Sequence, residues 1–516
     1  MRCRRHKRGT RNALRFDARL EENLVQLHEE LESRTYHPSR SVCFLLKQPK
    51  FREIFAADFR DRVVHHVLVD ALERDWERRF IHDSYACRKG KGTHRAVARV
   101  QTFMRRVTHN GTRPGYALQL DIQGFFFNID KEVLFQILDK HLQNDALRWL
   151  ARTMIFHDCT HHVIFKGNRG LWRQIPSHKT LFGTGNVRRL PIGNLSSQFF
   201  SNVYLNELDQ FAKHHLKVRY YLRYSDDFVL VHEDPAQLLT WREALAAFLE
   251  ERLHLCLTKP LVRPRLISNG LDFLGYIVRP DYLLVRRRVV NKIKVRLTGY
   301  QGQLVRLDAG AVVFTHDAAA LASLRASWAA SLAHMQRANS YRLRQALRDR
   351  HGWLRHFFRL DEGLLTPWIQ PLTRVGTLRQ QYQMVTQIYP DALVWCQVGC
   401  FYECYDAGAE WVRQHLGLAF TPPRCGFARQ CGVPGSLFPQ LIRRLMPLGR
   451  PVCVVREIAG RVGPVRPRGV AEYWQPVTGT LFLSCEYGPH FLVQKGRVLN
   501  REKERLVPNS VPGSCA

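Results

Sequence analysis

Residues 218–231 read VRYYLRYSDDFVLV, two apolar runs around a turn that carries two adjacent acids. The runs 218–222 and 228–231 predict the two strands of a hairpin, with Asp226 and Asp227 at its tight turn. Neighbouring carboxylates repel each other, and a hard divalent cation such as Mg2+ relieves that repulsion by binding their oxygens. A solvated turn is the alternative, because Ser and Asp are common turn residues.

A second acidic segment, residues 118–130, reads LQLDIQGFFFNID. It predicts an apolar strand that delivers Asp121, followed by three phenylalanines that favour a place in the core. Nucleotidyl transfer with two metal ions needs carboxylates from separate strands to hold ions about 4 Å apart. Asp121, Asp226 and Asp227 would be the catalytic ligands of two Mg2+ ions, for which Mn2+ can substitute.

The first segment resembles the YxDD motif of reverse transcriptase palms, and the second resembles their motif A. Further blocks of this family follow in its order. Residues 49–66 (PKFREIFAADFRDRVVHH) resemble the fingers motif, residues 80–93 (FIHDSYACRKGKGT) the next block, and residues 273–276 (FLGY) the primer grip. Ordered blocks are far more specific than one tetrapeptide. The resemblance therefore implies an RNA-directed DNA polymerase.

The resemblance also implies an α/β (α+β) right-hand polymerase fold, with fingers and palm followed by a helical thumb. Fingers and palm would occupy residues 1–285, including a basic N-terminal arm at about 1–20. Residues 286–372 show a mainly helical, basic pattern that is typical of a thumb. The proline and glycine residues of TPWIQPLTRVG, at 366–376, predict a linker after it.

Roles in binding the incoming dNTP follow from the same resemblance. Lys50 and Arg52 would balance the charge of the triphosphate, and Phe126 would pack under the sugar and exclude a 2′-hydroxyl. Lys259 corresponds to the lysine that protonates the leaving pyrophosphate, although its spacing departs from the family pattern. Gln198 completes the implied dNTP-binding set. The implied metal ligands are Asp121, Ile122, Asp226 and Asp227.

The segment before the predicted hairpin points to one subfamily. Residues 190–202 read LPIGNLSSQFFSN, where group II intron-like enzymes carry QGxxxSP. The IGxxxSQ pattern, followed by NVYLNELD at 202–209, resembles the reverse transcriptases of diversity-generating retroelements. Those enzymes copy a template RNA with errors concentrated at adenines.

Four residues of this pattern would set the fidelity: Ile192, Gly193, Ser197 and Gln198. An isoleucine cannot donate the hydrogen bonds of the glutamine that it replaces. Losing a polar restraint worth a couple of kcal/mol changes selectivity about tenfold or more. Neutral drift in a motif whose backbone does the work is the alternative.

Composition agrees with a nucleic-acid enzyme. The chain has 78 Lys and Arg against 45 Asp and Glu, and its formal net charge of +33 suits a polyanionic partner. It contains no apolar run of about 20 residues that could span a membrane. The start MRCRRHKRGTRN lacks the apolar core of a signal peptide, so the 13 cysteines are expected to be reduced thiols in a bacterial or phage-infected cytoplasm. The expected partners are template RNA, a primer or cDNA strand, dNTPs and a small basic accessory protein.

A second family is indicated further along the chain. Residues 380–417 and 452–458 resemble the mismatch-recognition domain I of MutS proteins, in the order QQY helix, strand, GDFYE signature, helix, GVP segment and final strand. The signature reads GCFYE here, with cysteine in the place of aspartate. The resemblance assigns residues 376–480 to a small α/β MutS domain I-like region and leaves 481–516 as a C-terminal extension.

Phe401 of this signature would contact nucleic acid by wedging beside a mispaired base, and Glu403 would hydrogen-bond that base. Stacking an aromatic ring on a base is worth about 1–3 kcal/mol. The chain has no GxxxxGK[ST] phosphate loop, so we expect nucleic-acid binding by this region without mismatch repair. A strand-to-helix junction that buries Phe401 is the alternative, and the thiols of Cys396, Cys400 and Cys404 would straddle that junction as structural residues.

Three other functions stay open for the polymerase region. A defence-associated or other bacterial reverse transcriptase of normal fidelity would share the catalytic core. A group II intron enzyme is disfavoured by the IGxxxSQ pattern. A non-catalytic RNA-binding scaffold would predict the loss of metal carboxylates, but all three are present.

Overall fold

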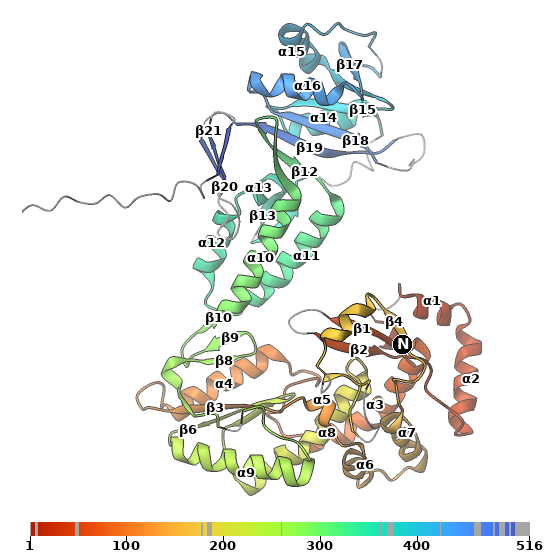
Figure 1. The fold of residues 1–516 in the computed structure, drawn as a ribbon, viewed down its shortest axis with the longest axis vertical. Coiled ribbons are helices and arrows are strands. Elements are labelled where there is room, and N and C mark those ends of the chain that lie inside the picture. The colour runs from red at the N-terminus through yellow and green to blue at the C-terminus, as the bar shows by residue number, and fades with distance from the viewer. Residues whose placement is uncertain are drawn as a thin grey trace, which may run out of the picture. The chain divides into compact units, whose positions relative to one another are not determined.

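The computed structural model describes residues 2–5, 9–46, 51–176, 179–182, 188–259, 261–361, 363–368, 376–423, 425–458, 466–477, 480–483, 491–494 and 497–500. The chain divides into two compact units, Met1–Leu283 and Leu284–Ala516. Figure 1 shows the helices and strands of each unit. No helix among the described residues is both long enough and apolar enough to cross a bilayer.

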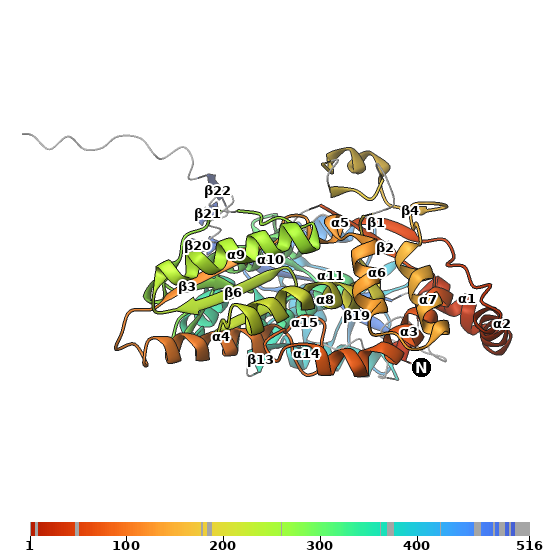
Figure 2. The same ribbon diagram turned by 90° about the horizontal axis from the view of Figure 1, so that it is seen from below.

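The first unit contains a four-stranded antiparallel sheet with the order β5-β6-β3-β7. Its strands are β3 (Tyr116–Asp121), β5 (Tyr221–Tyr224), β6 (Asp227–His232) and β7 (Arg265–Leu266). The side chains at 228–231 of β6 are at most 1% exposed. Both faces of β6 are therefore covered, which explains a continuous apolar run where a half-exposed strand would alternate. The helices α4 (Thr93–Val107) and α9 (Pro235–Leu253) pack on β6, and Figure 2 shows them on opposite sides of it.

A three-stranded sheet with the order β2-β1-β4 forms the second layer of this unit. It consists of β1 (Val42–Leu46), β2 (Arg52–Ala56) and β4 (Ile164–Lys166). Several helices complete the unit: α1 (Arg11–Asp17), α2 (Leu20–Glu32), α3 (Phe59–Arg79), α5 (Phe125–Asn128), α6 (Lys131–Asp139), α7 (Asp145–Phe156) and α8 (Leu195–Gln210). One buried cluster joins α3, β3, α6, α8, β6 and α9, so β3 and β6, the strands that carry Asp121 and Asp227, share one hydrophobic core. The FLGY segment lies at the turn between β8 (Leu271–Phe273) and β9 (Tyr276–Val278), and β10 (Leu283–Val285) pairs next to β9.

The second unit begins with the helices α10 (Arg287–Leu304), α11 (Ala318–Met335), α12 (Tyr341–Arg350) and α13 (Leu354–Phe357). Two hairpins interrupt them, β11 (Val305–Asp308) with β12 (Ala311–Thr315), and β13 (Phe358–Asp361) with β14 (Leu364–Pro367). We call α10 and α11 the thumb helices. Their core includes Leu297, Leu324 and Trp328, and the indole of Trp328 donates to the carbonyl of Gly363 over 2.7 Å.

A seven-stranded sheet with the order β11-β12-β19-β18-β15-β16-β17 dominates the rest of the second unit. Its later strands are β15 (Leu393–Val398), β16 (Phe401–Tyr405), β17 (Gln430–Pro434), β18 (Val452–Glu457) and β19 (Arg468–Pro476). The helices α14 (Leu378–Ile388), α15 (Asp406–Leu416) and α16 (Phe438–Leu445) accompany it. A separate sheet follows, formed by β20 (Thr480–Leu483), β21 (Phe491–Gln494) and β22 (Arg497–Asn500).

The helical pattern predicted for residues 286–372 is therefore wrong at two places: a hairpin lies between α10 and α11, and a second one follows α13. The first hairpin turns through Ala309 and Gly310, which both have positive φ (47° and 74°), as a two-residue type I′ turn requires. The β-branched run at 312–313 then favours a strand. The second hairpin takes up residues 364–367, where the predicted linker begins, and residues 369–375 of that linker lie outside the described part of the chain.

Candidate active site

The three predicted catalytic carboxylates meet at one end of the β5-β6-β3 sheet. Asp121 ends β3 and Asp227 begins β6, and the two are direct partners in the antiparallel ladder. Tyr224 pairs with Asp227 in the β5–β6 hairpin, which leaves Ser225 and Asp226 as the turn. The amide of Ile122 donates to the carbonyl of Asp226 over 3.3 Å, so the turn is also tied to the end of β3.

The charges of these carboxylates interact. Burial and the charges of Asp121 and Asp226 raise the pKa of Asp227 to about 7, against a smaller opposing effect of its hydrogen bond with Gln119. Thr258 holds Asp121 through two hydrogen bonds. Its hydroxyl donates to Oδ2 of Asp121 over 3.0 Å, and its amide donates to the main-chain carbonyl of Asp121 over 2.8 Å. The site therefore concentrates negative charge with only partial compensation.

An oxygen-only donor set of this kind fits a hard divalent cation, which would remove the repulsion. Within the described residues, no group of three or more His, Cys, Asp and Glu side chains is gathered closely enough to hold a metal ion. A cation would therefore take some of its ligands from elsewhere, and the main-chain carbonyl of Ile122 and the phosphates of a nucleotide are the available classes.

Beneath the turn lies a buried ion pair that the sequence reasoning missed. Arg223 is fully buried, and its Nε and Nη2 atoms donate to the two carboxylate oxygens of Asp209, each over 2.8 Å. Its Nη1 donates to the carbonyl of Ser225 over 3.1 Å. The side chains of Ser84 and Asn202 accept further bonds from Arg223 at 3.1 and 3.2 Å.

Arg223 thus connects the turn at Ser225 and Asp226 to α8, the helix that begins within the IGxxxSQ segment. Tyr221 donates to Asp209 as well, over 2.8 Å. A sequence signal existed: an arginine inside an apolar strand needs a buried acid, since an unpaired buried charge is very costly. The identity of that acid, 14 residues earlier, is a matter of tertiary structure.

The predicted fidelity segment is anchored to β2. The amide of Phe55 donates to the carbonyl of Ile192 over 2.8 Å, and the amide of Ala57 donates to Oδ1 of Asn194 over 3.1 Å. Gly193 has a φ of 131°, and a Cβ there would lie 2.7 Å from the carbonyl oxygen of Phe55. Only glycine therefore allows this close approach. The side chain of Ile192 is half-buried, Ser197 is buried and Gln198 is exposed in the first turn of α8.

The predicted dNTP-binding residues come from separate elements. Arg52 is exposed at the start of β2, whereas Lys50 lies outside the described residues. Phe126 is half-buried in α5, with its ring centroid 5.2 Å from that of Phe125. Lys259 is exposed and directly follows Thr258, the residue that holds Asp121.

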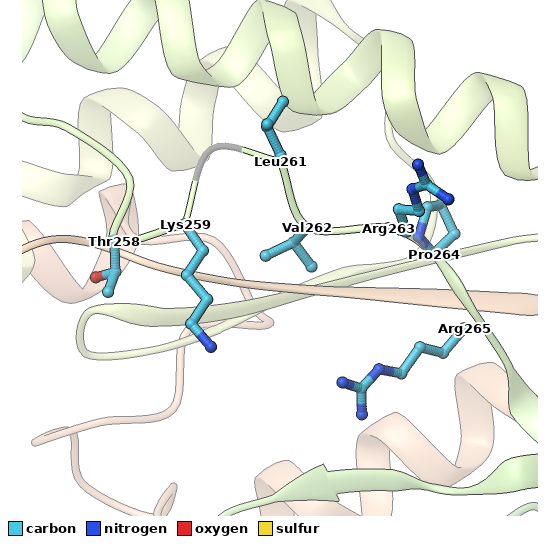
Figure 3. Close-up of a pocket in the computed structure, with 7 residues that line it drawn as sticks. All are labelled: Thr258, Lys259, Leu261, Val262, Arg263, Pro264 and Arg265. Atoms are coloured by element: carbon cyan, nitrogen blue, oxygen red, sulfur yellow. The ribbon is translucent and has the colours of Figure 1, made fainter.

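An open hollow of about 600 Å³ surrounds Lys259. Figure 3 shows that the side chains of Lys259 and Arg265 extend to the same side of the chain. The residues that line the hollow are Thr258, Lys259, Leu261, Val262, Arg263, Pro264 and Arg265. Three of these seven side chains are cationic, which suits an anionic group next to the carboxylates.

In the second unit, Phe401 and Glu403 lie on β16, after a turn at Gly399 and Cys400. Phe401 is 44% exposed, so the alternative of a strand-to-helix junction that buries it is wrong. The same geometry corrects the placement of the three cysteines, because a β-hairpin joins Cys396 to Cys404. Glu403 is half-buried, and its Oε2 accepts a 2.5 Å hydrogen bond from the hydroxyl of Tyr405.

Comparison with known proteins identifies two domains. Residues 45–278 match the family model "Reverse transcriptase (RNA-dependent DNA polymerase)", and residues 377–477 match that of "MutS domain I". Protein YkfC of Escherichia coli is 26% identical over 320 residues, which are 55% of this chain and 78% of that protein. The group II intron-encoded protein LtrA of Lactococcus lactis is 24% identical over 37% of this chain and 28% of its own length.

The DNA mismatch repair protein MutS of Alkaliphilus metalliredigens is 33% identical over 90 residues, 17% of this chain and 10% of that protein. The chain thus covers only a small part of the LtrA and MutS proteins that it matches. It carries an RNA-directed DNA polymerase domain of the reverse transcriptase family, with the right-hand polymerase fold, and a MutS domain I.

Proposed function

We propose that this chain, with its reverse transcriptase domain and its MutS domain I, makes error-prone cDNA from the template RNA of a diversity-generating retroelement. The observation that carries the proposal is the pairing of Asp121 with Asp227 in the β3–β6 ladder, beside Asp226 in the turn. Carboxylates from two neighbouring strands then lie at one end of the sheet, and nucleotidyl transfer with two metal ions requires carboxylates from separate strands.

The residues of the site would act as follows. Asp121, Asp226 and Asp227, with the carbonyl of Ile122, would hold Mg2+. When bound, the two ions would supply activation of the primer 3′-hydroxyl and neutralisation of the leaving pyrophosphate. Arg223 fixes the turn from below through the carbonyl of Ser225. Thr258 orients the carboxylate of Asp121.

The nucleotide would be bound by residues around this centre. Lys50 and Arg52 would balance the triphosphate charge, and the half-buried ring of Phe126 would exclude the 2′-hydroxyl of a ribonucleotide. Lys259, next to the residue that binds Asp121, would protonate the pyrophosphate. Gln198 is exposed and therefore accessible to the nascent base pair.

Low fidelity would follow from the segment anchored on β2. The backbone of Ile192 and Gly193 is held by the Phe55 amide and by the close approach at Gly193. A fixed backbone with an apolar Ile192 side chain would hold the base pair in place without polar discrimination. Ser197 is buried in the first turn of α8. A loss of a couple of kcal/mol in discrimination would raise errors about tenfold or more.

The test is Mg2+-dependent primer extension on a defined RNA template, with every product sequenced. Asp226→Ala should abolish cDNA, while Asp281→Ala, an exposed acid in the same unit, should leave it unchanged. Errors should concentrate opposite template adenines and fall in Ile192→Gln. Accurate cDNA would instead favour a defence-associated or other reverse transcriptase of normal fidelity. No cDNA from the wild type, with template RNA still bound, would favour the non-catalytic scaffold.

For the MutS domain I, we propose nucleic-acid binding. An exposed aromatic ring at a turn, with the acid Glu403 two residues later, is a stacking platform with a polar neighbour. Phe401→Ala should weaken the affinity for an RNA–DNA hybrid with one mispair more than for a fully paired hybrid, measured by fluorescence anisotropy. Fluorescence anisotropy would also detect a small basic accessory protein, because adding it would change the affinity of this chain for the template RNA.

A further inference from the structure

The MutS domain I and the thumb helices share one β-sheet. Strand β12, which lies between α10 and α11 in the chain, pairs with β19 from Ala311↔Pro476 to Thr315↔Glu472. The hairpin β11–β12 thereby covers an edge of the sheet that would otherwise expose unpaired backbone groups. Strand addition of this kind gives a connection that is much stiffer than a linker.

Strand directions place two features at the same end of this sheet. β12 and β18 are both antiparallel to β19, so they run in the same direction, and β15 is parallel to β18. The carboxyl ends of β12 and β15 therefore lie at the same end of the sheet, where the strands terminate. α11 starts after β12, and the turn before Phe401 follows β15. β15 lies three strands from β12, a separation of about 14 Å.

Aromatic packing fixes the junction between the two parts. The ring of Phe314 on β12 stacks on His356 with a centroid distance of 3.9 Å, and His356 lies 4.6 Å from Tyr473 on β19. Tyr389, which directly follows α14, stacks on the same histidine with a centroid distance of 6.0 Å. Strand β12 and helix α13 thus pack on the MutS domain I through aromatic side chains.

A polar network crosses the sheet from the hairpin to the strand of Phe401. Arg306 of β11 donates to Oε1 of Glu472 over 3.0 Å, and Arg456 of β18 lies 3.9 Å from Oε2 of the same glutamate. Nε of Arg456 also donates to the hydroxyl of Tyr402 over 3.2 Å. Tyr402 directly follows Phe401 on β16. The β11–β12 hairpin and the strand of Phe401 are therefore linked by the shared sheet and by this side-chain network.

The end of the sheet that carries Phe401 also has other exposed side chains suited to nucleic acid. Leu437, after β17, is 49% exposed, and Ile458, after β18, is 42% exposed. Arg466 keeps about half of its side-chain surface exposed. On the thumb side, Arg287, Arg288 and Arg296 of α10 are exposed. A nucleic-acid surface combines an aromatic ring on which a base can stack with cations for the phosphates. Phe401 would be that ring, with Leu437 and Ile458 as apolar neighbours.

We propose that the MutS domain I acts in cis, with Phe401 contacting the template–cDNA heteroduplex that its own polymerase domain has just made. The inference rests on the proposed function, since it takes the RNA–DNA heteroduplex as the ligand. Because the sheet fixes the Phe401 turn relative to the thumb helices, a heteroduplex bound along these helices meets Phe401 at a constant distance from them. The proposal therefore predicts a contact at a constant number of base pairs behind the primer 3′ end.

The test uses the full chain with a photo-crosslinking residue, in the variant Phe401→p-benzoylphenylalanine. The control is Leu448→p-benzoylphenylalanine. Leu448 is 42% exposed and precedes the amino end of β18, so it lies at the opposite end of the sheet from Phe401. RNA templates are annealed to DNA primers that lengthen one nucleotide at a time. The crosslink from position 401 should move by one nucleotide with each added nucleotide, and the Leu448 variant should give no such register.

Two results would overturn the proposal: no crosslink above that of the control, or crosslinks without a constant distance from the 3′ end. If position 401 crosslinks equally well to an excess of a second duplex that the polymerase domain does not hold, the domain acts in trans, and this result would also overturn the proposal. Primers of preset length make catalysis unnecessary. The same series run with Asp226→Ala therefore separates a failure of this inference from a failure of the proposed polymerase activity.

Discussion

Asp121 and Asp227 are direct cross-strand partners at the last step of the β3–β6 ladder. Like charges in this position destabilise a sheet, and they raise the pKa of Asp227 together with its burial. The carboxylates are therefore a cost to folding that a bound cation can offset. This relationship leads to the first prediction.

Asp227→Asn should stabilise the metal-free protein at pH 8 by about 1–3 kcal/mol, since a raised carboxyl pKa means that ionisation opposes folding. For the wild type, this contribution lowers the free energy of unfolding as the pH rises from about 4 to about 7. Chemical unfolding in EDTA and in Mg2+ measures both effects. Mg2+ should stabilise the wild type more than the variant. A variant that is less stable in EDTA would contradict the idea of a repulsive pair.

Arg223→Leu should destabilise the first unit by about 3–5 kcal/mol, because it leaves Asp209 as an unpaired buried charge. The combined variant Arg223→Met, Asp209→Leu, Tyr221→Phe should recover much of that stability, since no buried charge remains. It should still lose primer extension, because the Ser225 carbonyl loses its Arg223 donor. Urea unfolding and kcat are the measurements, with the exposed Arg219→Ala as the control. Full activity of the combined variant would mean that Arg223 serves stability alone.

Gly193→Ala should be destabilising by several kcal/mol or should displace the segment 192–198, because the added Cβ meets the Phe55 carbonyl and the φ of 131° strains any other residue. Gly299→Ala in α10 is the matched control. A Cβ there meets nothing within 4 Å, so alanine should be neutral or stabilising by up to about 1 kcal/mol. Thermal unfolding of both variants gives the comparison. An unchanged melting temperature for Gly193→Ala would argue against the close approach.

Local patterns predicted much of the catalytic region and little of the second unit's topology. The hairpin around Asp226 and the strand that ends at Asp121 could be predicted because apolar runs and turn residues mark them in the sequence. The pairing of Val313 with Trp474 could not, since the two residues lie 161 positions apart in the chain and any exposed edge strand would satisfy β12 locally. The Asp209 partner of Arg223 was missed for the same reason, as an acid at a helix end has an ordinary solvated interpretation. Patterns reveal which groups need a partner, and the fold decides which partner they find.

The junction of β12 and α13 with the MutS domain I should weaken on acidification. Burial, with a smaller contribution from the charge of the neighbouring His316, lowers the pKa of His356 to about 3, and burial lowers the pKa of His316 to about 4. The groups that face His356 are Phe314, Phe357, Tyr389, Tyr473 and His316. Apart from His316 these are aromatic rings, and none of them is an acid that could hold a charged imidazole.

A depressed histidine pKa means that the unfolded chain binds the proton first, so stability is complete above pH 6.5 and falls as the pH drops towards 4. Each of the two histidines should contribute a loss of about 1–2 kcal/mol at pH 5. Other buried histidines add to the total, so the informative quantity is the difference between wild type and His356→Phe. That variant keeps a ring against Phe314 and should lose less stability between pH 7.5 and pH 5. Urea unfolding at both pH values measures it, and equal losses in the two proteins would show that His356 stays uncharged for another reason.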